Sequence, residues 1–332
     1  MKGYLTLGID IGTSSVKARV LDTRTNQIVA KGFQTHPLLL SKPGYAEQEG
    51  DSYWSAVKSA IRQCLDCGID AENIAGVALS GLVGVMLPID KDGRPVRPGM
   101  IWMDARAEEE CNEIRERVGE EVINYNNGNR IACWFIEPKA LWMKKHEPGL
   151  FNKTYKLLSP AGYCTYRLCK EFTINKGDAG LFYPFDYQKG EWNTELAEKI
   201  GVPIDKYPKI YDCDEVVGTV DDEAAAETGL KKGTIVVAGG TDISSAALGC
   251  GVTKAYQAYY SMGTGSNLGI MIPTPERKEE FRILKWPHVI PGLTMFDAPM
   301  AFTGASLNWF NGTFGGHEQV IAKSTGQNVF SL

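Results

Sequence analysis

Residues 7–17 combine one acid with a glycine and three hydroxyl side chains in a short span. Asp10 lies near the end of an apolar run, and Val16 resumes an apolar alternation that continues to Val20. Between them lie Gly12, Thr13, Ser14 and Ser15. A glycine lets the backbone approach a ligand closely, and hydroxyl and N–H groups can donate to an anion. The pattern predicts a strand, an anion-binding turn and a second strand, with Asp10 placed to hold a metal ion against the turn; a plain surface hairpin is the alternative.

A second segment repeats this design. Residues 258–262 form a strand-like run, residues 266–270 resume as a strand, and the turn between them contains Gly263, Thr264 and Gly265. A chain built from two related halves would present two such hairpins facing each other across a cleft. We therefore expect the second turn to bind a phosphate, as the first does.

Two further segments place polar side chains where a ligand could meet them. Trp102, Asp104 and Arg106 occupy alternate positions, so they lie on one side of the chain if it is extended. As an alternative, Trp102 belongs to the core, and Asp104 and Arg106 form a surface ion pair. Asp242 follows a strand-like run and the glycines at 239 and 240, and it precedes a small-residue helix that we expect to begin at Ser244. Capping that helix is the alternative role for Asp242.

The intervening segments predict an α/β chain. After the first hairpin we expect a third strand at residues 28–33, an amphipathic helix from Asp51 or Ser52 to about Gly68, and strands at residues 74–80 and 85–89. Later strands are expected at residues 216–220 and 234–238. Further helices are expected at residues 107–118, where the Glu- and Arg-rich sequence predicts a solvated helix, and at residues 138–145, 159–168, 192–201, 222–229 and about 302–310, with residues 177–193 irregular. This order is typical of a layered fold whose ligands collect at one edge of a sheet.

Length and composition describe an ordinary globular chain. With 332 residues the chain is long for one domain, so we expect two. The net charge of −5 does not indicate binding to nucleic acid or to an anionic membrane surface, since both favour basic proteins. The longest apolar stretch, residues 76–89, is too short and too interrupted to span a bilayer, and the N-terminus has no signal-peptide pattern, so we expect a cytoplasmic protein. The 8 cysteines and 4 histidines show no metal-ligand spacing, and we expect the pair Cys64 and Cys67 to be structural.

Five motifs in register resemble the FGGY family of carbohydrate kinases, and within that family the sequence is most similar to xylulokinases. The motifs are residues 8–15, 102–106, 138–142, 239–242 and 261–265, and the similarity extends over essentially the whole chain. The resemblance implies the actin-like ATPase fold, in which two ribonuclease-H-like domains flank a cleft. It also implies one complete sugar-binding domain at residues 1–248 and the start of a nucleotide-binding domain at residues 249–332. The implied reaction is ATP-dependent phosphorylation of a hydroxyl group on a ketose such as xylulose, or on a polyol.

The resemblance further implies roles for individual residues. Asp242 corresponds to the catalytic base that accepts the proton of the attacking hydroxyl, and Asp10 and Asp242 correspond to the carboxylates at a Mg²⁺ ion. The residues implied to contact the nucleotide phosphates are Gly12, Thr13, Ser14, Ser15, Lys17, Gly263, Thr264 and Gly265. The residues implied to contact the sugar are Ser80, Gly81, Leu82, Val83, Trp102, Asp104, Arg106 and Asp242, with Arg106 orienting Asp104. For Lys17, a solvated charge on a strand is the alternative. The implied ligands are ATP, Mg²⁺ and a small sugar or polyol, and a homodimer is left open.

Two departures from the family pattern modify these expectations. Xylulokinases carry Gln-Met-His-Gly after the Ser-Gly that ends this strand, whereas here the positions are Leu82, Val83 and Gly84. The loss of polar groups predicts a less polar polyol or another ketose as substrate. The chain also ends before the adenine-binding part of the family's C-terminal half, so we expect weak ATP affinity and little or no turnover. A non-catalytic sugar-binding or regulatory relic of the same fold is the main alternative, and a sugar-independent ATPase is a third.

Overall fold

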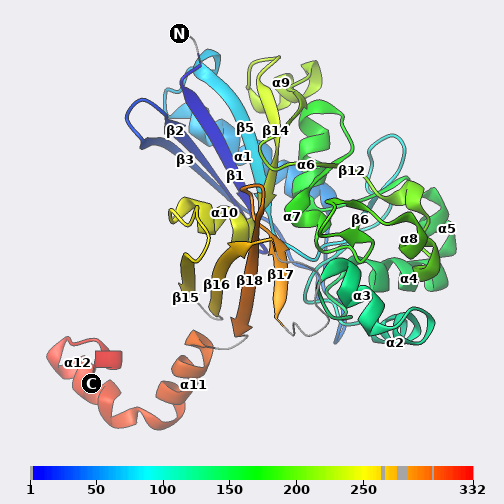
Figure 1. The fold of residues 1–332 in the computed structure, drawn as a ribbon. Coiled ribbons are helices and arrows are strands. Elements are labelled where there is room, and N and C mark those ends of the chain that lie inside the picture. The colour runs from blue at the N-terminus through cyan, green and yellow to red at the C-terminus, as the bar shows by residue number, and fades with distance from the viewer. Residues whose placement is uncertain (1–2, 263–265, 275–282, 301–302, 332) are drawn as a thin grey trace.

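The computed structural model describes residues 3–262, 266–274, 283–300 and 303–331 (Figure 1). Its larger sheet contains β1 (Leu5–Ile11), β2 (Ser15–Asp22), β3 (Gln27–Thr35), β5 (Ile74–Gly81), β13 (Val216–Thr219) and β14 (Ile235–Thr241). The strand order is β13-β14-β5-β1-β2-β3. The three central strands β14, β5 and β1 run parallel, and β13, β2 and β3 pair antiparallel with their neighbours. The predicted order of three strands, a helix and a further strand is therefore confirmed.

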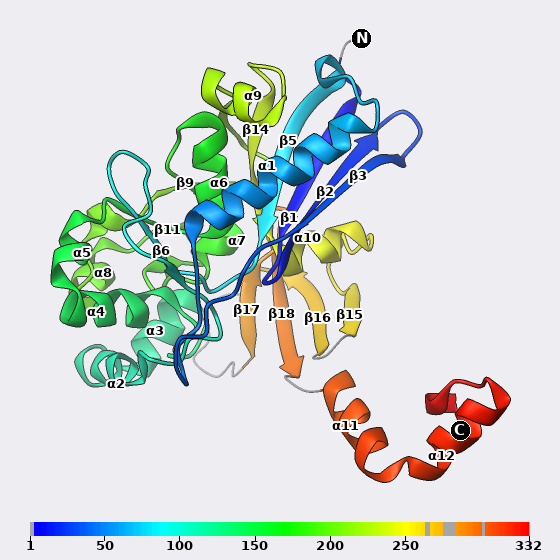
Figure 2. The same cartoon turned by 180° about the vertical axis from the view of Figure 1, so that it is seen from behind.

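The helix α1 (Gly50–Asp66) lies across one face of this sheet, beside α6 (Pro160–Cys169) and α9 (Asp222–Thr228) (Figure 2). Its apolar side, which includes Trp54 and Ile61, is buried in the core beneath the sheet. The helix begins at Gly50, one or two residues before the expected start at Asp51 or Ser52, and no side chain caps it. Residue 50 packs closely, because a Cβ atom at Gly50 would lie 2.6 Å from the side chain of Pro95.

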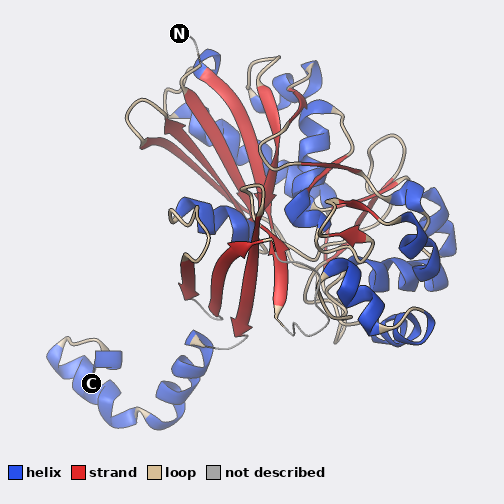
Figure 3. Cartoon of the chain, viewed as in Figure 1, coloured by secondary structure: helices blue, strands red, loops and turns tan. Residues whose placement is uncertain are grey.

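A second region of the fold combines helices with a smaller sheet (Figure 3). The helices are α2 (Glu108–Arg117), α3 (Glu120–Asn127), α4 (Ile136–His146), α5 (Pro148–Lys153) and α8 (Thr194–Ile200). The sheet has the order β15-β16-β18-β17, formed by β15 (Ala258–Met262), β16 (Ser266–Pro273), β17 (Leu284–Pro287) and β18 (Leu293–Met300). These helices and the smaller sheet share a second hydrophobic core, to which Phe135, Tyr183 and Trp286 contribute. This core continues across residue 248, and the domain boundary expected there stays a prediction.

The helix α2 is less solvated than its charged sequence predicts. Glu110, Cys111 and Ile114 are buried on the side that faces α4. The prediction of a solvated helix is therefore wrong for one of its faces, because that face packs into the second core.

Short elements connect the larger ones. They are β4 (Glu47–Gln48), β6 (Leu87–Ile89), β7 (Gly99–Met100), β8 (Lys156–Leu158), β9 (Thr173–Asn175), α7 (Lys176–Ala179), β10 (Phe185–Asp186), β11 (Glu191–Trp192) and β12 (Lys209–Tyr211). The strand predicted at residues 85–89 is thus shorter than expected. The segment predicted to be irregular contains one helical turn and two short strands.

The helix α10 (Asp242–Gly249) follows β14 directly, whereas α11 (Gly304–Phe314) and α12 (Gly316–Thr325) lie apart from the rest of the chain in both views (Figures 1 and 2). The side chains of Trp309, Phe310 and Phe314 on α11 are exposed. Within the described ranges, every helix is too short or too polar to cross a membrane.

Candidate active site

A cavity of about 790 Å³ lies against the carboxyl-terminal halves of β1, β5 and β14. Its lining includes Asp10, Lys17, Ser80, Gly240 and Ser245. The carboxyl ends of parallel strands meet at one edge of a sheet, which is where open α/β sheets bind ligands. The structure therefore brings together residues from the first hairpin, from the strand at 74–81 and from the glycine turn before Asp242.

Asp10 lies on the open face of the sheet with two polar partners. Lys17 Nζ is 3.3 Å from one carboxylate oxygen of Asp10, and the hydroxyl of Ser80 donates to the other at 3.3 Å. Both charged side chains remain partly exposed, so this ion pair contributes little stability and its members stay accessible to a ligand. The alternative of a purely solvated Lys17 is not supported, since Lys17 pairs with Asp10 and lines the cavity.

Hydrogen bonds to its backbone fix the turn after β1. The N–H of Gly12 donates to the carbonyl of Ser15 at 2.9 Å, and the N–H of His36 donates to the carbonyl of Ser14 at 3.1 Å. The carbonyl of Thr13 accepts from the amide of Gln48 at 2.7 Å. Ser15 is buried as the first residue of β2, so the expected phosphate contact through its side chain is not supported, whereas residues 12–14 remain accessible.

Gln48 and His36 are site-supporting residues that the sequence reasoning missed. The Gln48 side chain is fully buried and also accepts from the hydroxyl of Tyr53 at 2.7 Å. The His36 Nε2 donates to the carbonyl of Gly12 at 2.9 Å, while its Nδ1 accepts from Gln48 at 3.1 Å. Burial lowers the pKa of His36, which favours the neutral ring that this bonding pattern needs. The local sequence gave little signal, because Gln48 lies between two other polar residues, Glu47 and Glu49, just before a helix.

Asp242 is the first residue of α10, directly after the glycine turn. Thr241 is the N-cap, and its hydroxyl accepts from the N–H of Ser244 at 3.2 Å. The alternative that Asp242 caps this helix is therefore wrong. Glycine is required just before it, because Gly239 has a φ of +75° and a Cβ atom there would lie 1.9 Å from the carbonyl of Leu79.

The electrostatics of Asp242 suit a proton acceptor. Burial raises the pKa of Asp242 to about 7, and the negative charges of Asp10 and Asp178 add to the rise. The N–H of Ile243 donates to the carboxylate at 2.7 Å and opposes the rise only in part. The Asp10 carboxylate is therefore near enough to act on Asp242 electrostatically. The side chain of Asp242 still keeps a partly exposed edge.

The segment around Asp104 is a pair of turns and not an extended strand, so the condition under which its alternate residues would share one side is not met. The carboxylate of Asp104 is buried, accepts from the N–H of Ala46 at 2.7 Å, and pairs with Arg106 through Nε at 2.8 Å and Nη2 at 2.6 Å. Arg106 also contacts Glu47 at 2.8 Å and stacks over the ring of Tyr45 at 3.6 Å. This buried cluster supports neither a sugar contact by Asp104 nor a surface ion pair. It fixes the loop instead.

Trp102 is the member of this segment that reaches the open surface. Its side chain is 48% exposed, so the alternative that places it in the core is wrong. The indole N–H lies 3.4 Å from the hydroxyl of Thr13, on the turn after β1. An exposed indole beside a polar turn can serve as a platform for a sugar ring.

The four residues from Ser80 to Val83 do not act together. Only Ser80 contacts Asp10 and lines the cavity. Leu82 is 2% exposed and belongs to the core between the larger sheet and α1. Gly81 is buried against Ala161, and Val83 packs against the core that the helices share with the smaller sheet. The expected sugar contacts of Gly81, Leu82 and Val83 are not supported, because their side of the chain faces apolar neighbours.

A buried lysine links this loop to α4. Lys139 is fully buried, and its Nζ donates to the carbonyl of Gly84 at 2.5 Å and to that of Trp134 at 3.3 Å. Burial lowers the pKa of Lys139 to about 7. Gly84 has a φ of +68°, and a Cβ atom there would lie 2.8 Å from the carbonyl of Trp134. Lys139 thus positions the loop beneath Trp102.

The expected second phosphate turn, Gly263, Thr264 and Gly265, lies outside the described residues. Its flanking strands pair antiparallel, with Met262 opposite Ser266, as the repeated design predicts.

Comparisons with known proteins agree with this architecture. Residues 5–249 match the model of the FGGY family of carbohydrate kinases, N-terminal domain. The chain is 30% identical over 316 residues to xylulose kinase of Bacillus subtilis (strain 168), covering 94% of this chain and 62% of that protein. It is 28% identical over 338 residues to autoinducer-2 kinase of Escherichia coli (strain K12), covering 99% of this chain and 63% of that protein.

Solved structures show the same fold. The crystal structure of a xyloylose kinase from Brucella ovis superposes with a TM-score of 0.87 at 26% identity, covering 94% of this chain and 64% of that one. The chain thus spans less than two thirds of the length of the relatives it matches. Together with the sheet order and the cavity at its strand ends, the match over residues 5–249 shows that the chain has the actin-like ATPase fold and belongs to the FGGY family of carbohydrate kinases.

Proposed function

We propose that the protein transfers the terminal phosphate of ATP to a hydroxyl group of a ketose or polyol, with Asp242 as the general base. The observation that carries this proposal is the placement of Asp242. It lies at the end of β14, behind a glycine turn, in electrostatic contact with Asp10, and its pKa is raised to about 7. A carboxylate with a pKa near the working pH accepts a hydroxyl proton efficiently.

Apart from the general base, phosphoryl transfer depends mainly on holding the nucleotide phosphates and the attacking hydroxyl in position. The turn at residues 12–14 would contact the phosphates, since its carbonyls are held by His36 and Gln48 and its residues are not buried. Lys17 would place its ammonium group near the same phosphates. The glycines before Asp242 let this turn pass close to Leu79 and Val289, where a Cβ atom would not fit, and so set the position of the carboxylate.

The residues also fit a hard divalent cation. The charge of the Asp10 carboxylate raises the pKa of Asp242, so a cation between the two would relieve their repulsion. Carboxylate oxygens are ligands that Mg²⁺ prefers. Asp10 and Asp242 would hold the ion, which neutralises phosphate charge when bound.

The sugar is expected beside Trp102. Trp102 and Ser80, from the residues expected to contact the sugar, reach accessible surface, as does Thr13 of the expected phosphate turn, whereas Leu82 faces the core. Few side-chain hydrogen-bond partners remain at this position, which favours a substrate other than xylulose itself. The two kinds of named relatives suggest xylulose and autoinducer-2 as the first compounds to try.

A panel of ketoses and polyols, with xylulose and autoinducer-2 included, tests the proposal. Release of ADP in the presence of Mg²⁺ and ATP is measured for the chain and for Asp242→Asn. We expect sugar-dependent turnover that Asp242→Asn abolishes, and quenching of the protein's tryptophan fluorescence by the substrate in both proteins. Sugar binding without turnover would instead favour a non-catalytic sugar-binding protein, and sugar-independent hydrolysis would favour an ATPase.

A further inference from the structure

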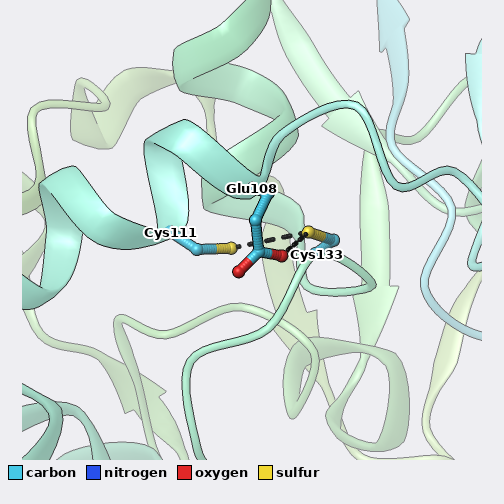
Figure 4. A group of neighbouring side chains, drawn as sticks. All are labelled: Glu108, Cys111 and Cys133. Atoms are coloured by element: carbon cyan, nitrogen blue, oxygen red, sulfur yellow. Dashed lines mark hydrogen bonds between the residues drawn. The ribbon is translucent and has the colours of Figure 1, made fainter. Parts of the chain in front are cut away.

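Three side chains that the proposed kinase site does not use converge at the start of α2. Glu108 and Cys111 lie on the first turn of that helix, and Cys133 lies in the loop before α4. Figure 4 shows their polar ends pointing toward one another. The two sulfur atoms are 3.8 Å apart, and the Cys133 thiol donates to a carboxylate oxygen of Glu108 at 2.9 Å. Candidate ligand atoms of all three lie within 4.8 Å of one another.

The sulfur separation suits two thiolates on a single metal ion. Zinc binds sulfur at about 2.3 Å with tetrahedral angles, which places two sulfur ligands about 3.8 Å apart. The observed distance is 3.8 Å. A disulfide needs a separation of about 2.0 Å, and both cysteines are free.

We propose that Glu108, Cys111 and Cys133 form a binding site for one thiophilic divalent cation such as Zn²⁺. Binding replaces the two thiol protons, which are released to solvent, so the ion is held by two thiolates and a carboxylate. Cys111 is buried, whereas Cys133 and Glu108 reach the surface, so solvent can enter and supply a fourth ligand. Arg115 lies 3.9 Å from the other oxygen of Glu108, a separation long enough to leave that carboxylate free to turn toward the metal.

The ion would connect two segments that support the loop of Trp102. The Cys133 sulfur contacts the carbonyl of Ala105 at 4.0 Å, between the two members of the buried pair Asp104 and Arg106. The neighbouring carbonyl of Trp134 accepts from Lys139. Occupancy should therefore stiffen this part of the chain and raise its melting temperature, because a ligand that binds only the folded state stabilises it.

The test is titration of the reduced chain with Zn²⁺, and with Cd²⁺ because its bonds to thiolates absorb in the ultraviolet. We expect one tightly bound ion per chain, a thiolate-to-Cd²⁺ absorption band and release of protons. The variants Cys111→Ser and Cys133→Ser should each weaken binding at least about tenfold, since even changes around metal ligands cost that much. Glu108→Gln should also weaken it. Cys67→Ser, which alters an exposed thiol at the end of α1, is the matched control and should leave binding unchanged.

Other outcomes would overturn the proposal. Binding that survives both cysteine substitutions, or a Cys111–Cys133 disulfide that forms in air while the reduced protein takes up no metal, would each exclude this site. Glu108 is exposed, so its variant should fold even if loss of the buried Cys111 thiol disturbs the chain. The readout is metal binding, so the result is independent of the kinase activity proposed above.

Discussion

Replacement of Asp242 by asparagine is expected to stabilise the protein at neutral and alkaline pH while it removes activity. The folded structure raises the pKa of this carboxyl from 3.8 to about 7, mainly through burial. A rise of that size corresponds to a penalty of up to about 4 kcal/mol for the ionised form. Since the asparagine side chain carries no charge to desolvate, we expect Asp242→Asn to gain about 2–4 kcal/mol in free energy of unfolding above pH 7. Functional residues often carry such a cost to stability.

The sign of the pH dependence follows from proton binding. Between about pH 4 and about pH 7 the folded protein keeps the Asp242 proton and the unfolded chain has lost it, so stability falls as pH rises through this window. Below the window both states are protonated and the contribution disappears. The difference between wild type and Asp242→Asn should therefore be small at about pH 4 and largest above about pH 7.

Urea unfolding at several pH values measures this difference directly. Asp214→Asn is the matched control, because Asp214 lines the cavity beside the glycine turn but is exposed, and its substitution should leave the pH profile unchanged. A gain for Asp242→Asn that is the same at every pH, or a variant no more stable than wild type above about pH 7, would show that burial does not disfavour the charge at this position.

Three further substitutions test the scaffold of the site. Gln48→Leu removes the donor to the Thr13 carbonyl and leaves buried hydrogen-bond partners unpaired. We expect the free energy of unfolding, measured in urea, to fall by about 2–4 kcal/mol and Mg-ATP to bind more weakly. Unchanged nucleotide binding would mean that the turn does not need this support. Gly239→Ala places a Cβ atom 1.9 Å from a backbone oxygen at a φ of +75°, so we expect the variant to have a lower melting temperature. A soluble variant with the wild-type melting temperature would contradict this close approach. Arg106→Met leaves the buried carboxylate of Asp104 without its cation and should lower the free energy of unfolding by about 3–5 kcal/mol. A decrease under about 1 kcal/mol would indicate that the pair is solvated.

The sequence was sufficient for the elements that depend on local pattern. The first hairpin, the strand expected at residues 74–80 and the glycine turn before Asp242 are confirmed, because apolar alternation and glycine placement act over a few residues. Family motifs then pointed to Asp10 and Asp242, and in the structure the charge of Asp10 helps to raise the pKa of Asp242.

The tertiary structure decided which side chains reach the site. Asp104 is buried because its carboxylate meets the N–H of Ala46, which lies 58 positions earlier in the sequence. Gln48 reaches the turn of Thr13 across 35 positions, and the sulfur of Cys111 meets that of Cys133 across 22. The local sequence carries no signal for such pairings, since they form only when packing of the cores fixes distant segments side by side. The sequence by itself thus determined which backbone turns exist, while burial against distant partners determined which residues remain free to bind a ligand.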